Sequence, residues 1–326
     1  MQDSNVNTSS KRILANRYIL ISELGSGLSS KVFKVLDEQT GETKVAKIYE
    51  DNATSTYLKE AQIFKMIQQI NHSNLIKYYE SDFDDLTQND TTTKKMYAIL
   101  EHASKGCLFD ALNKTKTGFT EDVCQYILLN LLNGVDALHK EGICHRDLKT
   151  ENIVMVGDKY DIKLIDFGFA AKYVNEENKP KKLREPVGTA YYCAPEIIER
   201  KPYDGTKADI FSIGATLFVL MTKNYGFVEG KVNNYSSSVK NSLYKLIKTK
   251  QYAKYWELME KFCDVKNLSP QFKNLYLKMV AYNPDERPTI EEIRKDEFMA
   301  GIVNASEEYI KFIRQKMINE IQFAQQ

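Results

Sequence analysis

The first hundred residues show the short alternations of apolar and polar positions that are typical of β-strands. Strands are predicted at residues 18–24, 32–36, 43–49, 72–78 and 96–100. Residues 55–70 instead repeat apolar side chains at helical spacing. The polar residues 82–95, rich in Asp and Thr, predict a loop. We therefore expect a β-rich N-lobe over residues 18–100 with one main helix, preceded by a poorly ordered polar tail at residues 1–17.

After a short connector at residues 101–105, which we interpret as a hinge, the apolar spacing becomes mostly helical. Helices are predicted at residues 107–113, 121–140, 209–221, 243–247, 256–262, 270–279 and 290–298. Thr120 is the expected N-cap of the second of these helices. This pattern predicts a mostly helical C-lobe over residues 106–299. Residues 300–326 predict a further, amphipathic helix, whose apolar positions are Ile310, Ile313, Met317 and Ile321.

Length and composition narrow the function classes. A chain of 326 residues exceeds what one core usually supports, which agrees with two lobes. Its net charge of +1 gives no indication of binding to nucleic acid or to an anionic membrane. Five scattered cysteines without a CxxC pair favour a reducing compartment, and no apolar run is long enough for a membrane span. We expect a cytoplasmic protein. The basic run at residues 179–184 leaves nuclear access open, although a solvated loop is the favoured interpretation.

The strongest chemical signal lies in residues 145–170, HRDLKTENIVMVGDKYDIKLIDFGFA. Asp147 stands five residues before Asn152, and Asp166 follows an apolar run. Phosphoryl transfer needs a carboxylate to accept the proton of a hydroxyl, oxygens to hold Mg²⁺, and a cation to neutralise developing charge. Asp147, Asn152, Asp166 and Lys149 supply these groups, although each alone is more often a turn or surface residue.

Two further features belong to the N-terminal part. Gly25 and Gly27 lie between two predicted strands, where backbone N–H groups can approach phosphate closely, although a plain hairpin has the same pattern. Lys47 lies on an apolar strand, where a lysine is expected at a sheet edge or with its amine extended to solvent unless it has a partner. Glu60, on the predicted helix, is the candidate, with a solvated helix face as the alternative.

Together these motifs resemble those of the eukaryotic protein kinases over residues 18–299. The resemblance implies an α+β, bilobal protein-kinase fold, with ATP bound between the lobes. HRDLKTEN, IDFGFA and GTAYYCAPE look most like the calcium/calmodulin-dependent kinases and the protist calcium-dependent kinases, although the chain has no EF-hand loop. Lys149 and Thr189 favour serine and threonine substrates over tyrosine.

The resemblance also implies roles for single residues. Gly25 and Gly27 would cover the ATP phosphates, and Leu24 and Val32 would contact adenine; Ser30 replaces the third glycine of this motif. Lys47 would hold the α- and β-phosphates and pair with Glu60. Backbone groups of Glu101 and Ala103 would bind the adenine edge. In the C-lobe, Asp147 would be the catalytic base and Lys149 the cation that stabilises the transferring charge. Asn152 and Asp166 would be the two Mg²⁺ ligands.

Other residues of the family pattern are expected to support the fold. Glu196 would pair with Arg287, and Asp209 would brace the catalytic loop. Residues 175–187 contain no Ser, Thr or Tyr, and Glu185 stands where many relatives carry a phosphorylated threonine. Our hypothesis is that Glu185 gives Arg146 a fixed negative charge in place of phosphate. The alternative is a solvated Glu185.

The leading interpretation is an active ATP- and Mg²⁺-dependent kinase that phosphorylates Ser or Thr in protein substrates. A pseudokinase scaffold is the alternative, disfavoured because Lys47, Asp147, Asn152 and Asp166 are all present. A small-molecule kinase is disfavoured by GTAYYCAPE. Glu151 suggests a mild preference for basic substrates. The helix at residues 300–326 could bind a regulatory partner or simply pack on the C-lobe.

Overall fold

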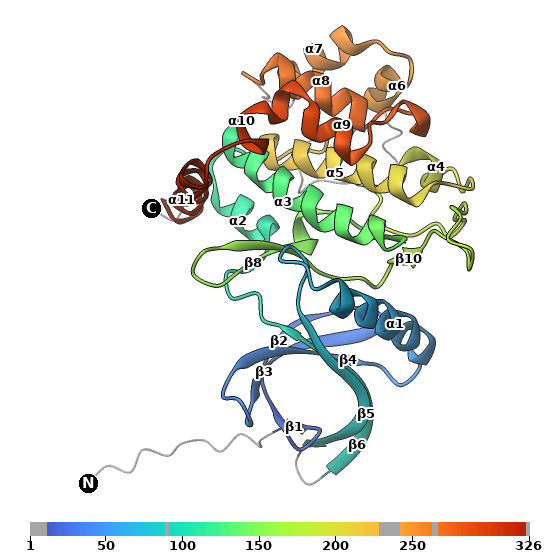
Figure 1. The fold of residues 1–326 in the computed structure, drawn as a ribbon, viewed down its shortest axis with the longest axis vertical. Coiled ribbons are helices and arrows are strands. Elements are labelled where there is room, and N and C mark those ends of the chain that lie inside the picture. The colour runs from blue at the N-terminus through green and yellow to red at the C-terminus, as the bar shows by residue number, and fades with distance from the viewer. Residues whose placement is uncertain (1–11, 89–90, 228–241, 263–266, 324–326) are drawn as a thin grey trace. The chain divides into compact units, whose positions relative to one another are not determined.

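The computed structural model describes residues 12–88, 91–227, 242–262 and 267–323 (Figure 1). The chain forms two compact units. Unit 1 comprises residues up to 71 together with 76–102, and unit 2 comprises residues 72–75 and the chain from 103 onward. The predicted combination of a β-rich N-terminal part and a helical C-terminal part is confirmed.

Unit 1 is a sheet that closes on itself, in the order β1-β2-β3-β4-β6-β5. Its core contains buried side chains from every strand except β5, such as Leu14, Val35, Ala46 and Ile99. The neighbouring strands are antiparallel. Their bounds are Ile13–Leu14 (β1), Tyr18–Ser26 (β2), Ser30–Asp37 (β3), Thr43–Tyr49 (β4), Tyr78–Gln88 (β5) and Thr91–Glu101 (β6).

The main helix of unit 1 is α1, Thr54–Ile70, as predicted from the spacing of its apolar residues. Its apolar face is buried, and the ring of Phe64 stacks on that of Tyr78 with centroids 5.2 Å apart. The helix ends at Asn71, whose φ of 44° is in the left-handed region that asparagine tolerates. This packing fixes α1 against the sheet and thereby positions Glu60.

Three predictions for this part of the chain are wrong. Ile13 and Leu14 form β1 instead of belonging to a disordered tail, because they pair with both β2 and β5; residues 1–11 lie outside the described part. The predicted loop at residues 82–95 is instead mostly strand. Its polar side chains face outward, where Lys94 pairs with Asp85 at 3.1 Å. The strand predicted at 72–78 begins only at Tyr78.

A buried carboxylate lies at the end of β3. Asp37 accepts hydrogen bonds from Arg17 Nε and Nη2, both at 2.8 Å, and from Lys44 Nζ at 2.6 Å. The hydrogen bond with Arg17 holds the pKa of the Asp37 carboxyl far below its usual range, with Lys44 adding to the effect against the opposing cost of burial. Through these hydrogen bonds Asp37, at the end of β3, connects Arg17, just before β2, with Lys44 on β4.

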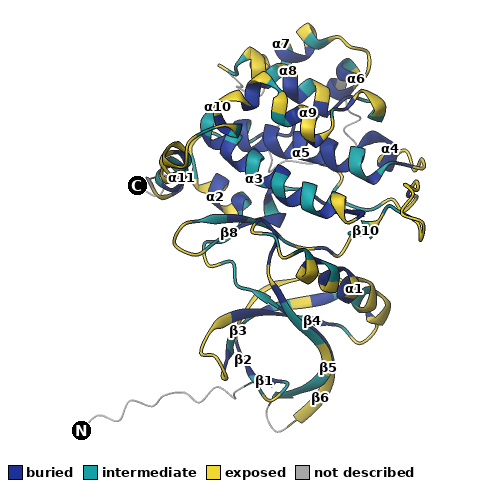
Figure 2. Ribbon diagram, in the orientation of Figure 1, coloured by how far each residue is buried: buried dark blue, intermediate teal, exposed yellow. Residues whose placement is uncertain are grey.

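Unit 2 is mostly helical and is built around α5, Gly205–Thr222. This helix is buried on nearly all sides, as its apolar sequence predicts (Figure 2). A Cβ at Gly214 would lie 2.9 Å from Met279 Cβ, so glycine allows α8 to approach closely. The helices around it are α2 (Leu108–Lys114), α3 (Glu121–Lys140), α4 (Pro195–Ile198), α6 (Ser242–Lys248), α7 (Tyr252–Phe262), α8 (Pro270–Met279) and α9 (Ile290–Lys295).

Short strands and 3₁₀ turns complete unit 2. The strand pairs are β7 (Ile143–Cys144) with β10 (Ala171–Lys172), and β8 (Ile153–Val156) with β9 (Asp161–Leu164). The 3₁₀ turns are η1 (Thr150–Asn152), η2 (Pro284–Glu286) and η3 (Glu297–Met299). The helix predicted over residues 290–298 is therefore broken, because Asp296 leaves helical geometry and its side chain caps η3 through the Phe298 N–H.

The C-terminal segment is not one helix over residues 300–326. It forms α10 (Ala300–Val303) and α11 (Glu307–Phe323), and residues 324–326 lie outside the described part. The predicted apolar face of α11 is largely buried, with Ile313 and Met317 fully covered, and α11 contacts α3 and α2 (Figure 1). Its buried face accounts for the amphipathic pattern through packing within unit 2.

The contact of α11 also changes the expected cap of α3. Thr120 occupies the N-cap position, but its hydroxyl does not cap its own helix. It donates to Glu320 Oε1 at 2.5 Å, and the Thr120 N–H donates to Glu320 Oε2 at 3.2 Å. A carboxylate from α11 thus lies at the N-terminus of α3, where the helix dipole favours negative charge. Among the described helices, none is long and apolar enough to cross a membrane.

Candidate active site

In unit 1 the structure brings together the predicted pair Lys47 and Glu60. Lys47 Nζ on β4 lies 2.6 Å from Glu60 Oε1 on α1, and the Glu60 side chain is only 1% exposed. The other carboxylate oxygen accepts a hydrogen bond from Tyr49 Oη at 2.8 Å. A buried carboxylate is stable only when paired and hydrogen-bonded, so this arrangement holds Lys47 in one orientation.

The predicted phosphate-covering residues lie where β2 turns into β3. Gly25 pairs with Val32, and the Gly27 N–H donates to Ser30 O at 2.9 Å. Leu24 is exposed, and a Cβ built on Gly25 would meet nothing within 4 Å among the described residues. Packing within the chain therefore does not require glycine at position 25.

The backbone of the two predicted adenine contacts takes part in hydrogen bonds within the chain. The Glu101 N–H donates to Lys77 O at 2.9 Å. The Ala103 carbonyl accepts from the Gly106 N–H at 3.1 Å, which makes the N–H the group that Ala103 can offer. Ala103 belongs to unit 2 and Glu101 to unit 1.

In unit 2 the expected catalytic loop, residues 145–152, follows β7 and is held by a residue of α5. Asp209, fully buried, accepts hydrogen bonds from the His145 N–H at 2.9 Å and the Arg146 N–H at 2.8 Å. Its Oδ2 also lies 2.8 Å from His139 Nε2 at the end of α3. Arg146 has a φ of 68°, a conformation that costs free energy in a non-glycine residue. Asp209 therefore braces this strained loop, as expected.

Asp147 lies at the centre of a ring of hydrogen bonds. Thr189 Oγ1 donates to Asp147 Oδ1 at 2.7 Å. Lys149 Nζ lies 3.0 Å from Asp147 Oδ2 and donates to Thr189 Oγ1 at 2.7 Å. Asn152 Nδ2 donates to Asp147 O at 2.8 Å and to Asp147 Oδ2 at 3.1 Å. One carboxylate is thus oriented by a cation, a hydroxyl and an amide.

The predicted metal ligands Asn152 and Asp166 lie on adjacent segments. The N–H of Ile165, the residue before Asp166, donates to Asn152 O at 3.0 Å. Because the Asn152 amide nitrogen is used by Asp147, its side-chain oxygen is the atom that remains for a ligand. Asp166 has a φ of 59°, which turns the chain sharply after β9. An amide oxygen and a carboxylate fit Mg²⁺, because this ion binds oxygen ligands and usually takes one or two from the protein and others from substrate phosphates.

The structure also contains the predicted contact between Arg146 and Glu185. Arg146 Nη2 lies 2.9 Å from Glu185 Oε2; the arginine side chain is 4% exposed and the glutamate side chain 60%. Arg146 Nε donates to Phe169 O at 2.5 Å, so the same guanidinium also holds the segment after Asp166. Burial disfavours the charge of Arg146, but a hydrogen bond to Tyr203 and the contact with Glu185 raise its pKa.

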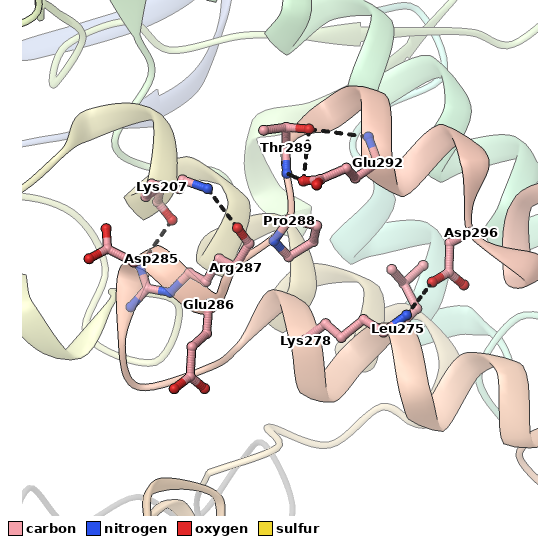
Figure 3. A pocket seen from close by; sticks show the side chains of 10 residues that line it. All are labelled: Lys207, Leu275, Lys278, Asp285, Glu286, Arg287, Pro288, Thr289, Glu292 and Asp296. Carbon is pink, nitrogen blue, oxygen red and sulfur yellow. Dashed lines mark hydrogen bonds and ion pairs between the residues drawn. The ribbon is translucent and has the colours of Figure 1, made fainter.

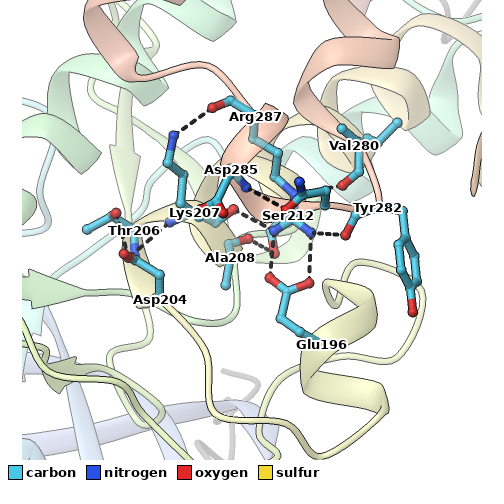
Figure 4. A network of polar contacts seen from close by, with 12 residues as sticks. Glu196, Asp204, Thr206, Lys207, Ala208, Ser212, Val280, Tyr282, Asp285 and Arg287 are labelled. Carbon is cyan, nitrogen blue, oxygen red and sulfur yellow. Dashed lines mark hydrogen bonds and ion pairs between the residues drawn. The ribbon is translucent and has the colours of Figure 1, made fainter.

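The expected structural pair Glu196 and Arg287 is present (Figure 4). Arg287 Nη1 and Nη2 donate to the two Glu196 oxygens at 2.6 and 2.7 Å, and Arg287 is 1% exposed. A neighbouring hollow contains several charged side chains that are already satisfied, including Lys278 with Asp296 at 2.8 Å (Figure 3). This hollow is lined by none of the predicted site residues.

The sequence was compared with models of known protein families. The model of the protein kinase domain matches residues 18–299. The chain belongs to the protein kinase family. The expected eukaryotic kinase fold is therefore confirmed, and the relatives identify the serine/threonine type.

Three relatives illustrate the similarity of this kinase to known proteins. CBL-interacting serine/threonine-protein kinase 15 of Arabidopsis thaliana is 30% identical over 92% of this chain and 65% of that protein. Calcium-dependent protein kinase 5 of Plasmodium berghei (strain Anka) is 31% identical over 83% of this chain and 43% of its own length. Serine/threonine-protein kinase SAPK3 of Oryza sativa subsp. japonica is 30% identical over 86% and 77%. The kinase chain thus spans less than two thirds of the first two relatives.

Sequence reasoning missed two tyrosines of this kinase. Tyr49 lies two residues after Lys47 on β4, and this spacing, which puts both on one face of the strand, was an available signal. Tyr203 accepts from Arg146 Nη1 at 3.1 Å and donates to Glu185 O at 2.9 Å. It is contributed by the segment before α5, and no local pattern indicates that contact.

Proposed function

We propose that this chain transfers the γ-phosphoryl group of ATP to serine and threonine hydroxyls of protein substrates. The observation that carries the proposal is the ring around Asp147, in which Lys149 and Thr189 contact each other and both carboxylate oxygens are oriented. Phosphoryl transfer depends on positioning and charge stabilisation more than on covalent catalysis, and such a ring supplies both.

In this mechanism Asp147 orients the attacking hydroxyl and accepts its proton. Thr189 shares the carboxylate with the incoming hydroxyl and keeps the activation segment next to it. Lys149 supplies positive charge where the transferring phosphoryl group becomes more negative. Asn152 and Asp166 would hold Mg²⁺, which neutralises phosphate charge when bound.

Unit 1 supplies groups of the kind that bind ATP. Lys47, oriented by Glu60, would bind the α- and β-phosphates. Gly25 and Gly27 would let backbone N–H groups approach the phosphates, which gives a reason for glycine at a position where packing does not require it. Leu24 and Val32 would contact the adenine ring.

For the activation segment we propose that Glu185 takes the place of an activating phosphate. Phosphate orders such segments by pairing with arginine, and here a carboxylate of the chain itself lies against Arg146. The segment would then be held in place without prior phosphorylation. A carboxylate carries less charge than phosphate, so the anchoring is weaker.

Two further proposals concern the setting of the enzyme. We propose a cytoplasmic location, for which the cysteines of the described part, all with free thiols, are the supporting observation. For α11 we favour a packing role over recruitment of a regulatory partner, because Ile313, Met317 and Ile321 are buried within unit 2.

The test is ATP turnover by the purified full chain on a generic basic protein and a peptide library, with Mg²⁺ present. We expect phosphoserine and phosphothreonine products. Asp147→Asn retains the shape of the site but removes the base, and we expect a loss of about 10²- to 10⁴-fold in kcat. Asp158→Asn, at a fully exposed turn position, is the matched control and should be unaffected.

Nucleotide binding separates this proposal from its alternative. Thermal shifts measured with ATP and Mg²⁺ report binding independently of turnover. A chain that binds ATP and yet phosphorylates nothing, with wild type and Asp166→Asn indistinguishable, would be a pseudokinase scaffold.

A further inference from the structure

The activation segment between β10 and α4 has a group of cations that the proposed reaction does not use. Residues 178–184 contain four cations and no acidic residue, and all four are exposed (Figure 2). Two of them have partners: Lys179 lies 2.7 Å from Glu177, and Lys182 lies 3.9 Å from Asp204. Within the described part of the chain, Lys181 and Arg184 have no ion pair.

This segment is held against unit 2. Leu183 is buried, and its N–H and carbonyl exchange hydrogen bonds with Tyr203, at 2.8 and 2.9 Å. Side chains alternate along an extended chain, so Lys182 and Arg184 point away from the core when Leu183 points into it. The predicted solvated loop is therefore held to Tyr203 at Leu183, and its cations are exposed to solvent.

A further exposed cation lies close along the chain to the point where the segment is held. Arg200 lies three residues before Tyr203, the residue that pairs with Leu183, and its side chain is exposed. It likewise forms no ion pair among the residues that the structure describes. We define the activation-segment basic patch as Lys181, Lys182, Arg184 and Arg200. The whole chain has a net charge of only +1, so the patch is a local concentration of charge.

The patch is close along the chain to the reacting groups. Arg184 immediately precedes Glu185, which contacts Arg146 of the catalytic loop at 2.9 Å. Thr189, which donates to Asp147, lies five residues after Arg184. An extended chain spans at most about 3.5 Å per residue, so Arg184 lies within roughly 18 Å of Thr189. A peptide bound with its hydroxyl at Asp147 can reach the patch with a residue within about five positions of that hydroxyl.

We propose that the activation-segment basic patch selects substrates with aspartate or glutamate close to the phosphorylated residue. This inference rests on the proposed kinase activity and specifies its substrate class. Lys181, Arg184 and Arg200, which form no ion pair in the described part of the chain, gain interaction energy from a carboxylate of the substrate, and this attraction also raises the rate of encounter. The patch thus counters any preference for basic residues from Glu151, whose carboxylate already accepts a hydrogen bond from Thr150 at 3.0 Å.

The experiment uses the full chain and synthetic peptides with one serine in a neutral background. One Asp, or one Lys, is placed at each position from five before to five after the serine. Because exposed charge pairs are individually weak, we expect Asp at one or two positions to raise kcat/KM by about three- to tenfold, and Lys there to lower it. The increase should shrink at high ionic strength.

A charge-neutralising variant tests whether the patch is responsible. The triple substitution Lys181→Gln, Arg184→Gln and Arg200→Gln should abolish the preference for Asp while leaving the rate on the neutral peptide unchanged. The matched control removes three exposed lysines elsewhere in unit 2, Lys159→Gln, Lys254→Gln and Lys311→Gln, and should keep the preference. If the triple variant loses activity on the neutral peptide, Arg184→Gln alone is used and should halve the preference or more.

The outcomes are separable. Equal rates on all peptides, a preference for Lys, or a preference for Asp that survives in the triple variant would each overturn the inference while leaving the kinase activity standing. Failure to phosphorylate any peptide or protein would overturn the proposed function and this inference with it.

Discussion

The contact between Glu185 and Arg146 predicts a graded loss of activity when the charge at position 185 is changed. Glu185→Gln removes the negative charge, and Glu185→Lys places a cation against a buried guanidinium. If the carboxylate anchors the activation segment, activity should fall in the order wild type, Gln, Lys. Glu185→Asp retains the charge on a shorter side chain and should lie between wild type and Gln.

The magnitude follows from the exposure of the two partners. Charge-assisted hydrogen bonds contribute about 1.5–3 kcal/mol, but pairs with an exposed partner contribute only about 0.2–1 kcal/mol. Glu185 is 60% exposed while Arg146 is 4% exposed, which places the pair near the upper end of the exposed range. A loss of about 1 kcal/mol shifts the equilibrium between ordered and disordered segment roughly fivefold. A segment that is about half to nine-tenths ordered would then lose about 1.5- to threefold in kcat/KM for Gln, and more for Lys.

The assay is peptide phosphorylation by full-length protein after phosphatase treatment, together with limited proteolysis of the activation segment. Each variant is measured at low and high salt, because screening weakens the exposed side of the pair. Glu177→Lys is the matched control: Glu177 lies on the same segment and pairs with Lys179 instead of Arg146. Its activity and proteolysis pattern should remain those of wild type.

Two results would refute the reasoning. Glu185→Lys with wild-type activity and wild-type proteolysis would show that the contact does not order the segment. Loss of wild-type activity on phosphatase treatment would show that a phosphate elsewhere is required.

Three further predictions concern stability and the catalytic loop. Asp37→Asn should lower the free energy of unfolding by about 3 kcal/mol at pH 7, because Arg17 and the buried Lys44 lose the carboxylate that they contact at 2.6–2.8 Å and, among the described residues, keep only the longer ion pairs with Glu80 and Glu42. Arg17 depresses the pKa of Asp37, so the carboxylate stabilises the fold fully above the unfolded pKa of about 3.9. This stabilisation is lost as the pH falls through the lower folded pKa. The free energies of unfolding of wild type and variant, measured in urea, should therefore converge in acid. Met317→Ala should cost about 3 kcal/mol in thermal unfolding, because it leaves a cavity under α11. Gly188→Ala should lower kcat, because its φ of 105° and a Cβ at 2.6 Å from Arg146 O force the catalytic loop to shift.

The sequence predicted those features for which the chemistry itself dictates residue types. A buried lysine requires an acid, so Lys47 led to Glu60, and the two are 2.6 Å apart. The resemblance to kinases, in which an anion anchors the activation segment to the arginine before the catalytic aspartate, led from Arg146 to Glu185, and the two are 2.9 Å apart. In both cases one residue creates an electrostatic requirement, and few residues in the right segment can meet it.

Prediction failed where polarity was taken as evidence of irregular structure. Residues 82–95 are polar because none of their described side chains is buried in the pair of strands β5 and β6, and Lys94 pairs with Asp85 across the two strands. Backbone hydrogen bonds between strands do not depend on apolar side chains, so a polar hairpin has no strong hydrophobic period. A run of exposed polar residues was therefore wrongly interpreted as a loop, although it forms strands.

Contacts between distant segments lie beyond any local pattern. Thr120 was correctly placed at the start of α3, but Glu320, two hundred residues later, takes its hydroxyl and its N–H. A local N-cap and a distant carboxylate satisfy the same helix terminus equally well, so the sequence around Thr120 fits both. The amphipathic pattern of α11 indicates that a face must be covered, and only the fold shows that α3 covers it. What a sequence reveals is therefore the demand for a partner, and the partner itself is predictable only when the chemistry leaves few candidates.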